Sequence, residues 1–145
     1  MTNSYRQTIQ IDAPPEKVFD YFTKPEQLVR WMGEFARLEA VADGLFSVDI
    51  DGVLIRGRFV ALRRPDLIEI AWGEAGNDHM PPGATRLSIS LKPHENGTFL
   101  TLVHSGLEET EAKKHAYGWP HFLDRLAIAA TGRDPGPYPW ASANV

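Results

Sequence analysis

The chain has 145 residues, a length typical of one domain, and it contains no cysteine. The absence of cysteine excludes disulfides, thiolate nucleophiles, zinc–thiolate sites and iron–sulfur clusters. Fifteen Lys and Arg against nineteen Asp and Glu give a formal net charge of −4, which argues against a nucleic-acid partner. No apolar signal core opens the chain and no apolar segment is long enough to span a bilayer. We therefore expect a cytoplasmic protein with no membrane partner.

Two isoleucines alternate with polar residues over 5–12, which predicts a first, half-buried strand. The Ala-Pro-Pro-Glu segment at 13–16 then predicts a helix start, since proline is tolerated in the first turn and an acidic residue suits the helix dipole. Thr23 and Glu26 have the spacing of a capping box. This spacing predicts a second short helix directly after the first.

From Phe35 to His104 the hydrophobic period changes to two, and four turn signals divide the stretch. Asp-Gly and Asn-Gly pairs favour tight hairpins because their central residues accept positive φ. The expected strands cover 35–42, 45–51, 53–63, 67–73, 84–92 and 98–105. With the first strand they make seven, which we expect in one antiparallel meander.

A long helix is predicted from about 108 to 131, followed by a Pro- and Gly-rich tail over 132–145. Pro120 lies inside this helix and should kink or split it. Tyr138 and Trp140 are expected to dock the tail onto the protein surface or onto a second subunit. The apolar stripe of the helix comprises Ala112, His115, Ala116, Trp119, Phe122, Leu123, Leu126, Ala127 and Ala130.

These elements imply an α+β fold in which the terminal helix covers the apolar face of the sheet. A sheet bent around one long helix tends to leave a cleft, and such a cleft is the default ligand site. The domain is expected to cover residues 1–131.

Several segments together resemble a known family. They are IDAPPEKVF at 11–19, TKPEQLVRW at 23–31, the glycine of 56–58, RPDLIEIAW at 64–72, GTFLTLVHSG at 97–106, and Gly118-Trp119 with Phe122, Leu123 and Leu126. The chain resembles the activator-of-heat-shock-protein-ATPase-homologue group of the START-like, or SRPBCC, superfamily. The resemblance covers residues from about 5 to 131.

The resemblance implies a helix-grip fold, in which a curved antiparallel sheet wraps a terminal helix around a cavity. Members of the superfamily bind lipids, steroids and aromatic polyketides, and some catalyse cyclisation or hydrolysis. The namesake of the group is a co-chaperone that also uses a separate amino-terminal domain, for which this chain has no room. A fold of this kind does not by itself fix the activity.

Strand parity indicates which residues face the interior, and the inward set is almost wholly apolar. The exceptions are His104 on the last strand and His115 on the helix stripe. Either they are satisfied core residues, or they are polar groups that orient a ligand or move a proton. The expected ligand-binding residues are Phe59, Trp72, Leu102, His104, His115, Trp119 and Phe122.

The loop over 73–84 is the longest break between strands and carries His79 and Met80. Loops of this length are lids or mobile hairpin ends, and both alternatives are open here. An exposed position is expected for His79.

No nucleophile elbow, phosphate loop or dinucleotide fingerprint is present, and the histidine spacing does not suggest zinc. We therefore expect no cofactor. The favoured function is the binding of a small hydrophobic molecule, aromatic or lipid-like, in the cavity. The alternatives are a cyclase- or hydrolase-type enzyme that uses a cavity histidine, and a co-chaperone-like interaction module with a chaperone contact. A homodimer is a further expectation.

Overall fold

The structure is a computed structural model that describes residues 2–136. Its elements, in chain order, are β1 (Asn3–Ile11), α1 (Pro15–Thr23), α2 (Pro25–Leu28), β2 (Phe35–Leu38), β3 (Leu45–Ile50), β4 (Val53–Arg63), β5 (Leu67–Glu74), β6 (Thr85–His94), β7 (Gly97–Leu107) and α3 (Glu109–Ala129).

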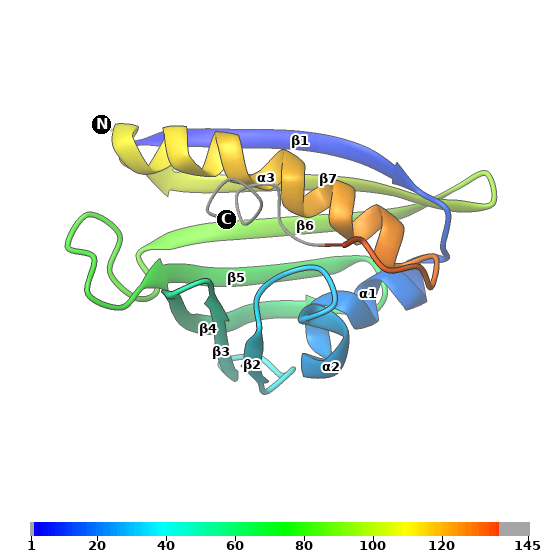
Figure 1. Ribbon diagram of the computed structural model, residues 1–145, viewed down its shortest axis with the longest axis horizontal. Helices are drawn as coiled ribbons and strands as arrows, with labels where there is room; N and C mark the ends of the chain where they lie inside the picture. Colours follow the sequence, from blue (N-terminus) through cyan, green and yellow to red (C-terminus); the bar gives the residue numbers. More distant parts are fainter. Residues whose placement is uncertain (1, 137–145) are drawn as a thin grey trace.

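The seven strands form one antiparallel sheet in the order β1-β7-β6-β5-β4-β3-β2. Strands β2 to β7 are a meander, and β1 joins the sheet beside β7 at the edge opposite β2. Figure 1 shows α3 lying across one face of the curved sheet, with α1 and α2 near the β2–β4 side. The arrangement confirms the α+β fold and the two short helices predicted after the first strand.

The core lies between α3 and the inner face of the sheet. Trp119, Leu123 and Leu126 of α3 are buried, as the helical stripe predicts. Strand β5 contributes Ile68, Ile70 and Trp72 from one face, since residues two apart share a side. The other strands add the inward residues Phe46, Val48, Phe59, Leu87, Ile89, Leu91, Leu100 and Leu102.

Strand β4 departs from strict alternation because its register with β5 shifts between Phe59 and Ala61. After this bulge Leu62 lies opposite Ile68, and Leu62 packs against the core. Strict alternation over 53–63 would place Ala61 on the inner face with Phe59, but Ala61 lies opposite Glu69 and Leu62 takes the inward position. The extra residue of a bulge switches the side chains that follow it in the strand to the opposite face of the sheet.

The predicted capping box at Thr23 is wrong. Thr23 ends α1, and its hydroxyl donates to the carbonyl of Phe19 at 3.0 Å instead of capping α2. The α2 helix begins after Lys24 with no side-chain cap. Helix α3 runs unbroken through Pro120, so of the two effects expected of this proline, a kink or a split, the split does not occur.

The structure follows the tail as far as Gly136, so the predicted docking of Tyr138 and Trp140 lies outside the described residues. Arg125 of α3 donates from Nη1 to the carbonyl of Gly136 and from Nε to the carbonyl of Trp31 at 3.1 Å. Its guanidinium thus joins the helix to the start of the tail and to the segment after α2. Within residues 2–136 no helix is both long enough and apolar enough to cross a bilayer.

Candidate functional site

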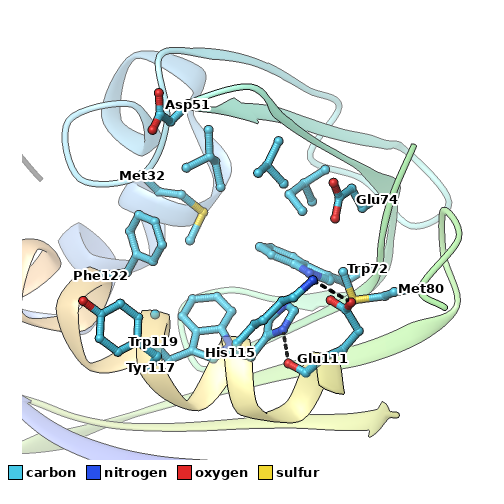
Figure 2. A pocket seen from close by; sticks show the side chains of 15 residues that line it. Met32, Asp51, Trp72, Glu74, Met80, Glu111, His115, Tyr117, Trp119 and Phe122 are labelled. Atoms are coloured by element: carbon cyan, nitrogen blue, oxygen red, sulfur yellow. Dashed lines mark hydrogen bonds and ion pairs between the residues drawn. The ribbon is translucent and has the colours of Figure 1, made fainter. Parts of the chain in front are cut away.

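A pocket of about 430 Å³ lies between α3 and the end of the sheet where β3 and β5 finish and β4 begins (Figure 2). Its apolar lining is Met32, Ile50, Val53, Ile55, Trp72, Met80, Tyr117, Gly118, Trp119 and Phe122. Its polar lining is Asp51, Glu74, Glu111, Lys114 and His115. A pocket of this size, with apolar walls and a few polar groups, is typical of small-molecule sites.

The aromatic wall depends on Gly57, which lies between Phe46 and Trp72 in the register of β3, β4 and β5. A Cβ on Gly57 would come 1.7 Å from the carbonyl oxygen of Ala71, so no larger residue fits. The ring centroids of Phe46 and Trp72 lie 5.9 Å apart, and Trp119 lies 5.5 Å from Trp72. The absence of a side chain at Gly57 thus lets Trp72 pack between Phe46 of the sheet and Trp119 of α3.

His104 is fully buried behind this wall, and both of its ring nitrogens are hydrogen-bonded. The indole N–H of Trp119 donates to Nδ1 at 3.1 Å. The hydroxyl of Thr85 donates to the carbonyl of Trp72 at 2.7 Å, so its oxygen accepts from Nε2–H of His104 at 2.8 Å. These bonds fix one neutral tautomer. Burial, and then the nearby His115, lower the pKa of His104 to about 3.

His115 lies on the pocket side of His104, with the two ring centroids 4.7 Å apart. Its Nδ1 donates to the carbonyl of Glu111, one turn earlier, at 2.7 Å. Burial lowers the pKa of His115, although that hydrogen bond to Glu111 opposes the shift. In the neutral ring Nε2 is then a lone-pair acceptor. Among the described residues no hydrogen bond to this nitrogen is present, so it is available to a ligand.

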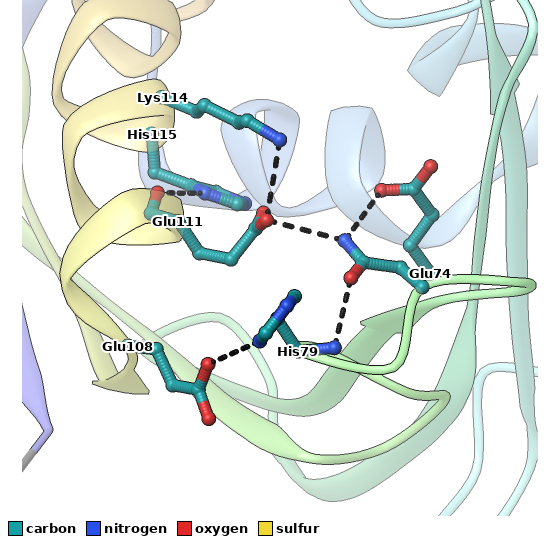
Figure 3. Close-up of polar contacts among 7 residues, drawn as sticks. Glu74, His79, Glu108, Glu111, Lys114 and His115 are labelled. Atoms are coloured by element: carbon teal, nitrogen blue, oxygen red, sulfur yellow. Dashed lines mark hydrogen bonds and ion pairs between the residues drawn. The ribbon is translucent and has the colours of Figure 1, made fainter.

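A polar network closes one side of the pocket (Figure 3). The side-chain amide nitrogen of Asn77 donates to Glu74 Oε1 and to Glu111 Oε2, both at 3.2 Å. Lys114 Nζ lies 3.3 Å from the same oxygen of Glu111. The amide of Asn77 therefore bridges two carboxylates, one from β5 and one from α3.

The loop between β5 and β6 is fastened over this network. His79 Nδ1 lies 2.9 Å from Glu108 Oε2, just before α3 begins. Met80 is buried and lines the pocket, and its backbone nitrogen donates to the carbonyl of Asn77 at 3.2 Å. His79 is exposed, as expected from the sequence. The loop is part of the pocket wall.

The structure brings four of the seven expected site residues to the pocket: Trp72, His115, Trp119 and Phe122. Phe59, Leu102 and His104 face the interior as expected, but they are fully buried and do not line the pocket. Strand parity identifies the face of the sheet on which a residue lies. It does not identify the end of the sheet at which helix and strands separate.

Glu111 and Met80 line the pocket but were not predicted as site residues. Glu111 precedes His115 by four residues and shares its helix face, a spacing visible in the sequence. Met80 is the one large apolar residue in its loop. Both signals were present, but a charged residue and a loop residue are normally expected in solvent.

Among residues 2–136 no group of three or more His, Asp or Glu side chains is arranged to hold a metal ion. The carboxylates of the pocket instead satisfy Asn77 and Lys114.

A curved antiparallel sheet closed by one long terminal helix, with a pocket between them, defines a helix-grip protein of the START-like class. Residues 12–131 match the model of the family described as activator of Hsp90 ATPase homolog 1-like protein. The chain belongs to this family. The comparison with curated proteins found no match.

Solved structures agree with the assignment. An AHSA1-like protein from Rhizobium etli is 37% identical, with 97% of this chain and 89% of that chain covered and a TM-score of 0.77. The Aha1 dimer from Colwellia psychrerythraea is 26% identical, with 88% and 96% covered and a TM-score of 0.76. CalU16 from Micromonospora echinospora is 25% identical, with 94% and 77% covered and a TM-score of 0.72.

Proposed function

We propose that the protein binds a small hydrophobic molecule, with an aromatic or lipid-like body, in the pocket between α3 and the sheet. The observation that carries this proposal is the volume of about 430 Å³ left beside Trp72, Trp119 and Phe122. A partly open pocket of this volume with mainly apolar walls has the size and lining of sites that bind small molecules. A cytoplasmic location, in which the protein carries or senses such a molecule, is part of the proposal.

The walls of the pocket suit such a ligand. Trp72 and Trp119 are buried and held by their neighbours, so their rings present fixed surfaces. Tyr117 is 62% exposed and Lys114 is also exposed, which places these two residues at the mouth. Nε2 of His115 then provides one neutral hydrogen-bond acceptor beside these aromatic walls.

The test uses the neutral fluorescent probe N-phenyl-1-naphthylamine and two variants of α3. Gly118→Leu adds a side chain at a position that lines the pocket, whereas Ala116→Leu adds the same side chain at an exposed position. We expect Gly118→Leu to weaken probe binding by about tenfold or more, a change of about 1.4 kcal/mol, and Ala116→Leu to leave it unchanged. Equal binding by both variants, or no binding by the unmodified protein, would refute the proposal.

A second candidate is an enzyme in which His115 is the general base. The observation that favours it is the hydrogen bond from Nδ1 to the carbonyl of Glu111, which orients the ring and leaves Nε2 to accept a proton. His104 does not suit this role, since both of its nitrogens are already bonded. Turnover of a bound ligand that falls by about a hundredfold in His115→Gln would support this candidate.

We also propose that two copies associate through the edge strand β2, where Phe35 is 73% exposed. An unpaired sheet edge beside an exposed aromatic ring is a natural pairing surface. The Colwellia relative is described as a dimer. Light scattering of Phe35→Lys, which should shift a dimer to the monomer mass, tests this; a monomeric unmodified protein would refute it.

A further inference from the structure

The charges that line the pocket are unequal. Asp51, Glu74 and Glu111 each carry a carboxylate, whereas Lys114 is the one lysine or arginine among the lining residues. The formal charge of the lining at neutral pH is therefore negative. Glu111 is buried, with only 4% of its side chain exposed, so water screens its charge weakly.

Hydrogen-bond acceptors also outnumber donors around Glu74, Glu111 and His115. Asn77 donates to both carboxylates at 3.2 Å, and Lys114 adds one donor to Glu111 at 3.3 Å, whereas each carboxylate can accept several hydrogen bonds. Nε2 of His115 offers one further lone pair. Figure 3 shows the side chains of Glu74, Glu111 and His115 approaching one another from β5 and α3. A group that binds to these three side chains must donate hydrogen bonds. The buried indole N–H of Trp72, which has no hydrogen-bond partner among the described residues, is a separate donor in the same wall.

We propose that the ligand carries a protonated amine, which lies between Glu74, Glu111 and His115 while its hydrophobic body lies against Trp119 and Phe122. This inference rests on the proposed function, because it specifies the charge of the molecule that the pocket binds. An ammonium group carries a positive charge and up to three hydrogen-bond donors. It therefore matches both the excess of negative charge and the excess of acceptors in the pocket.

The aromatic wall supports the same charge. A cation next to an aromatic face is attracted by the negative face of the ring, most strongly with tryptophan. Trp72 and Trp119 both line the pocket, and the centroid of Trp72 is 6.2 Å from that of His115. An amine bound near His115 is therefore close to an indole.

An anionic ligand would have to use Lys114. Its ammonium nitrogen already lies 3.3 Å from Glu111, and 64% of its side chain is exposed. Binding an anion there would place it beside two carboxylates. Lys114 is instead the cation that a ligand amine would compete with for Glu111.

The experiment compares three probes with one ring system: 1-naphthylmethylamine, 1-naphthalenemethanol and 1-naphthoate. Calorimetric titration at neutral pH should show the amine binding about tenfold or more tightly than the alcohol, and the carboxylate most weakly. High salt should reduce the advantage of the amine and leave the alcohol unaffected.

Three variants localise the effect. Glu74→Gln should remove most of the preference for the amine over the alcohol, and Glu109→Gln, on the exposed first turn of α3, should leave both affinities unchanged. Lys114→Gln should strengthen amine binding several-fold, a gain that a damaged fold could not produce.

Equal affinity for amine and alcohol, or a preference for the carboxylate, would overturn the inference and leave the proposed function standing. Failure of all three probes to bind would overturn both.

Discussion

The indole N–H of Trp119 donates to Nδ1 of His104 at 3.1 Å, and this hydrogen bond ties α3 to β7 inside the core. His104 is fully buried, and Trp119 is 2% exposed. Because the second nitrogen of His104 bonds to Thr85 of β6, one ring connects the helix to two strands. The pair therefore forms the rear support of the pocket.

Trp119→Phe keeps most of the buried ring but removes the donor to His104. A buried acceptor left without its partner should cost about 1–3 kcal/mol of unfolding free energy. Trp119→Ala should cost about 3–5 kcal/mol, because it also leaves a cavity. Urea unfolding measures both, with the exposed Tyr117→Phe as the control. A loss below about 0.5 kcal/mol in Trp119→Phe would show that the hydrogen bond contributes little.

The stability of the protein should fall in mild acid. The pKa of His104 is lowered to about 3 and that of His115 is also lowered, so the folded protein resists the protons that the unfolded chain accepts. Stability from His104 is present above the ordinary histidine pKa of about 6.5 and should decrease by about 1.4 kcal/mol per pH unit below it. His115, whose pKa is also lowered, should add to the decrease in the same direction. The decrease from His104 ends near pH 3.

Unfolding free energies measured by urea from pH 7 downwards would show this slope. His104→Leu should be less stable at pH 7 but should lose stability less steeply with acid than the unmodified protein. His94→Gln, at an exposed position, should leave the slope unchanged. Ring-proton NMR that finds ordinary titration of His104 would contradict the expectation.

Gly118 should lower the stability of α3 while leaving space in the pocket. It lies in the middle of α3, and a Cβ there would make ordinary contact with Phe122 at 3.9 Å. Gly118→Ala should therefore raise the unfolding free energy by up to about 1 kcal/mol. Because residue 118 lines the pocket, the same methyl group should weaken binding of N-phenyl-1-naphthylamine. Improved stability with unchanged binding would place the ligand elsewhere.

Asn77 should hold the β5–β6 loop in place. Asn77→Ala removes the donor shared by Glu74 and Glu111, and about 1 kcal/mol of local stability should be lost with it. Amide hydrogen exchange over residues 75–84 should become faster, while exchange in β1 and β7 should not change. Asp78→Ala, at the exposed neighbouring position, is the matched control. Identical exchange in the two variants would exclude a fastening role for Asn77.

Periodicity was sufficient to predict most of the fold. Ile68, Ile70 and Trp72 face inward because side chains alternate between the two faces of a strand, and the apolar residues of β5 occupy alternate positions. The turn signals indicated where the strands end. The facing of Leu62 could not be predicted, since nothing local marks the extra residue of the bulge before it. The site was harder still. Glu111 belongs to it because tertiary packing buries a charge that α3 alone would leave in solvent.

The same packing means that the pocket forms only when segments far apart in the sequence come together. Its walls come from the segment after α2, the β3–β4 turn, the end of β5, the following loop and the middle of α3, so no fragment contains it. A ligand of this pocket must then bind the native state and not the unfolded chain. At a concentration one hundred times its dissociation constant it should add about 2.7 kcal/mol to stability. Thermal melts over a chemical library can therefore identify compounds that occupy the pocket, with no assumption about their chemistry.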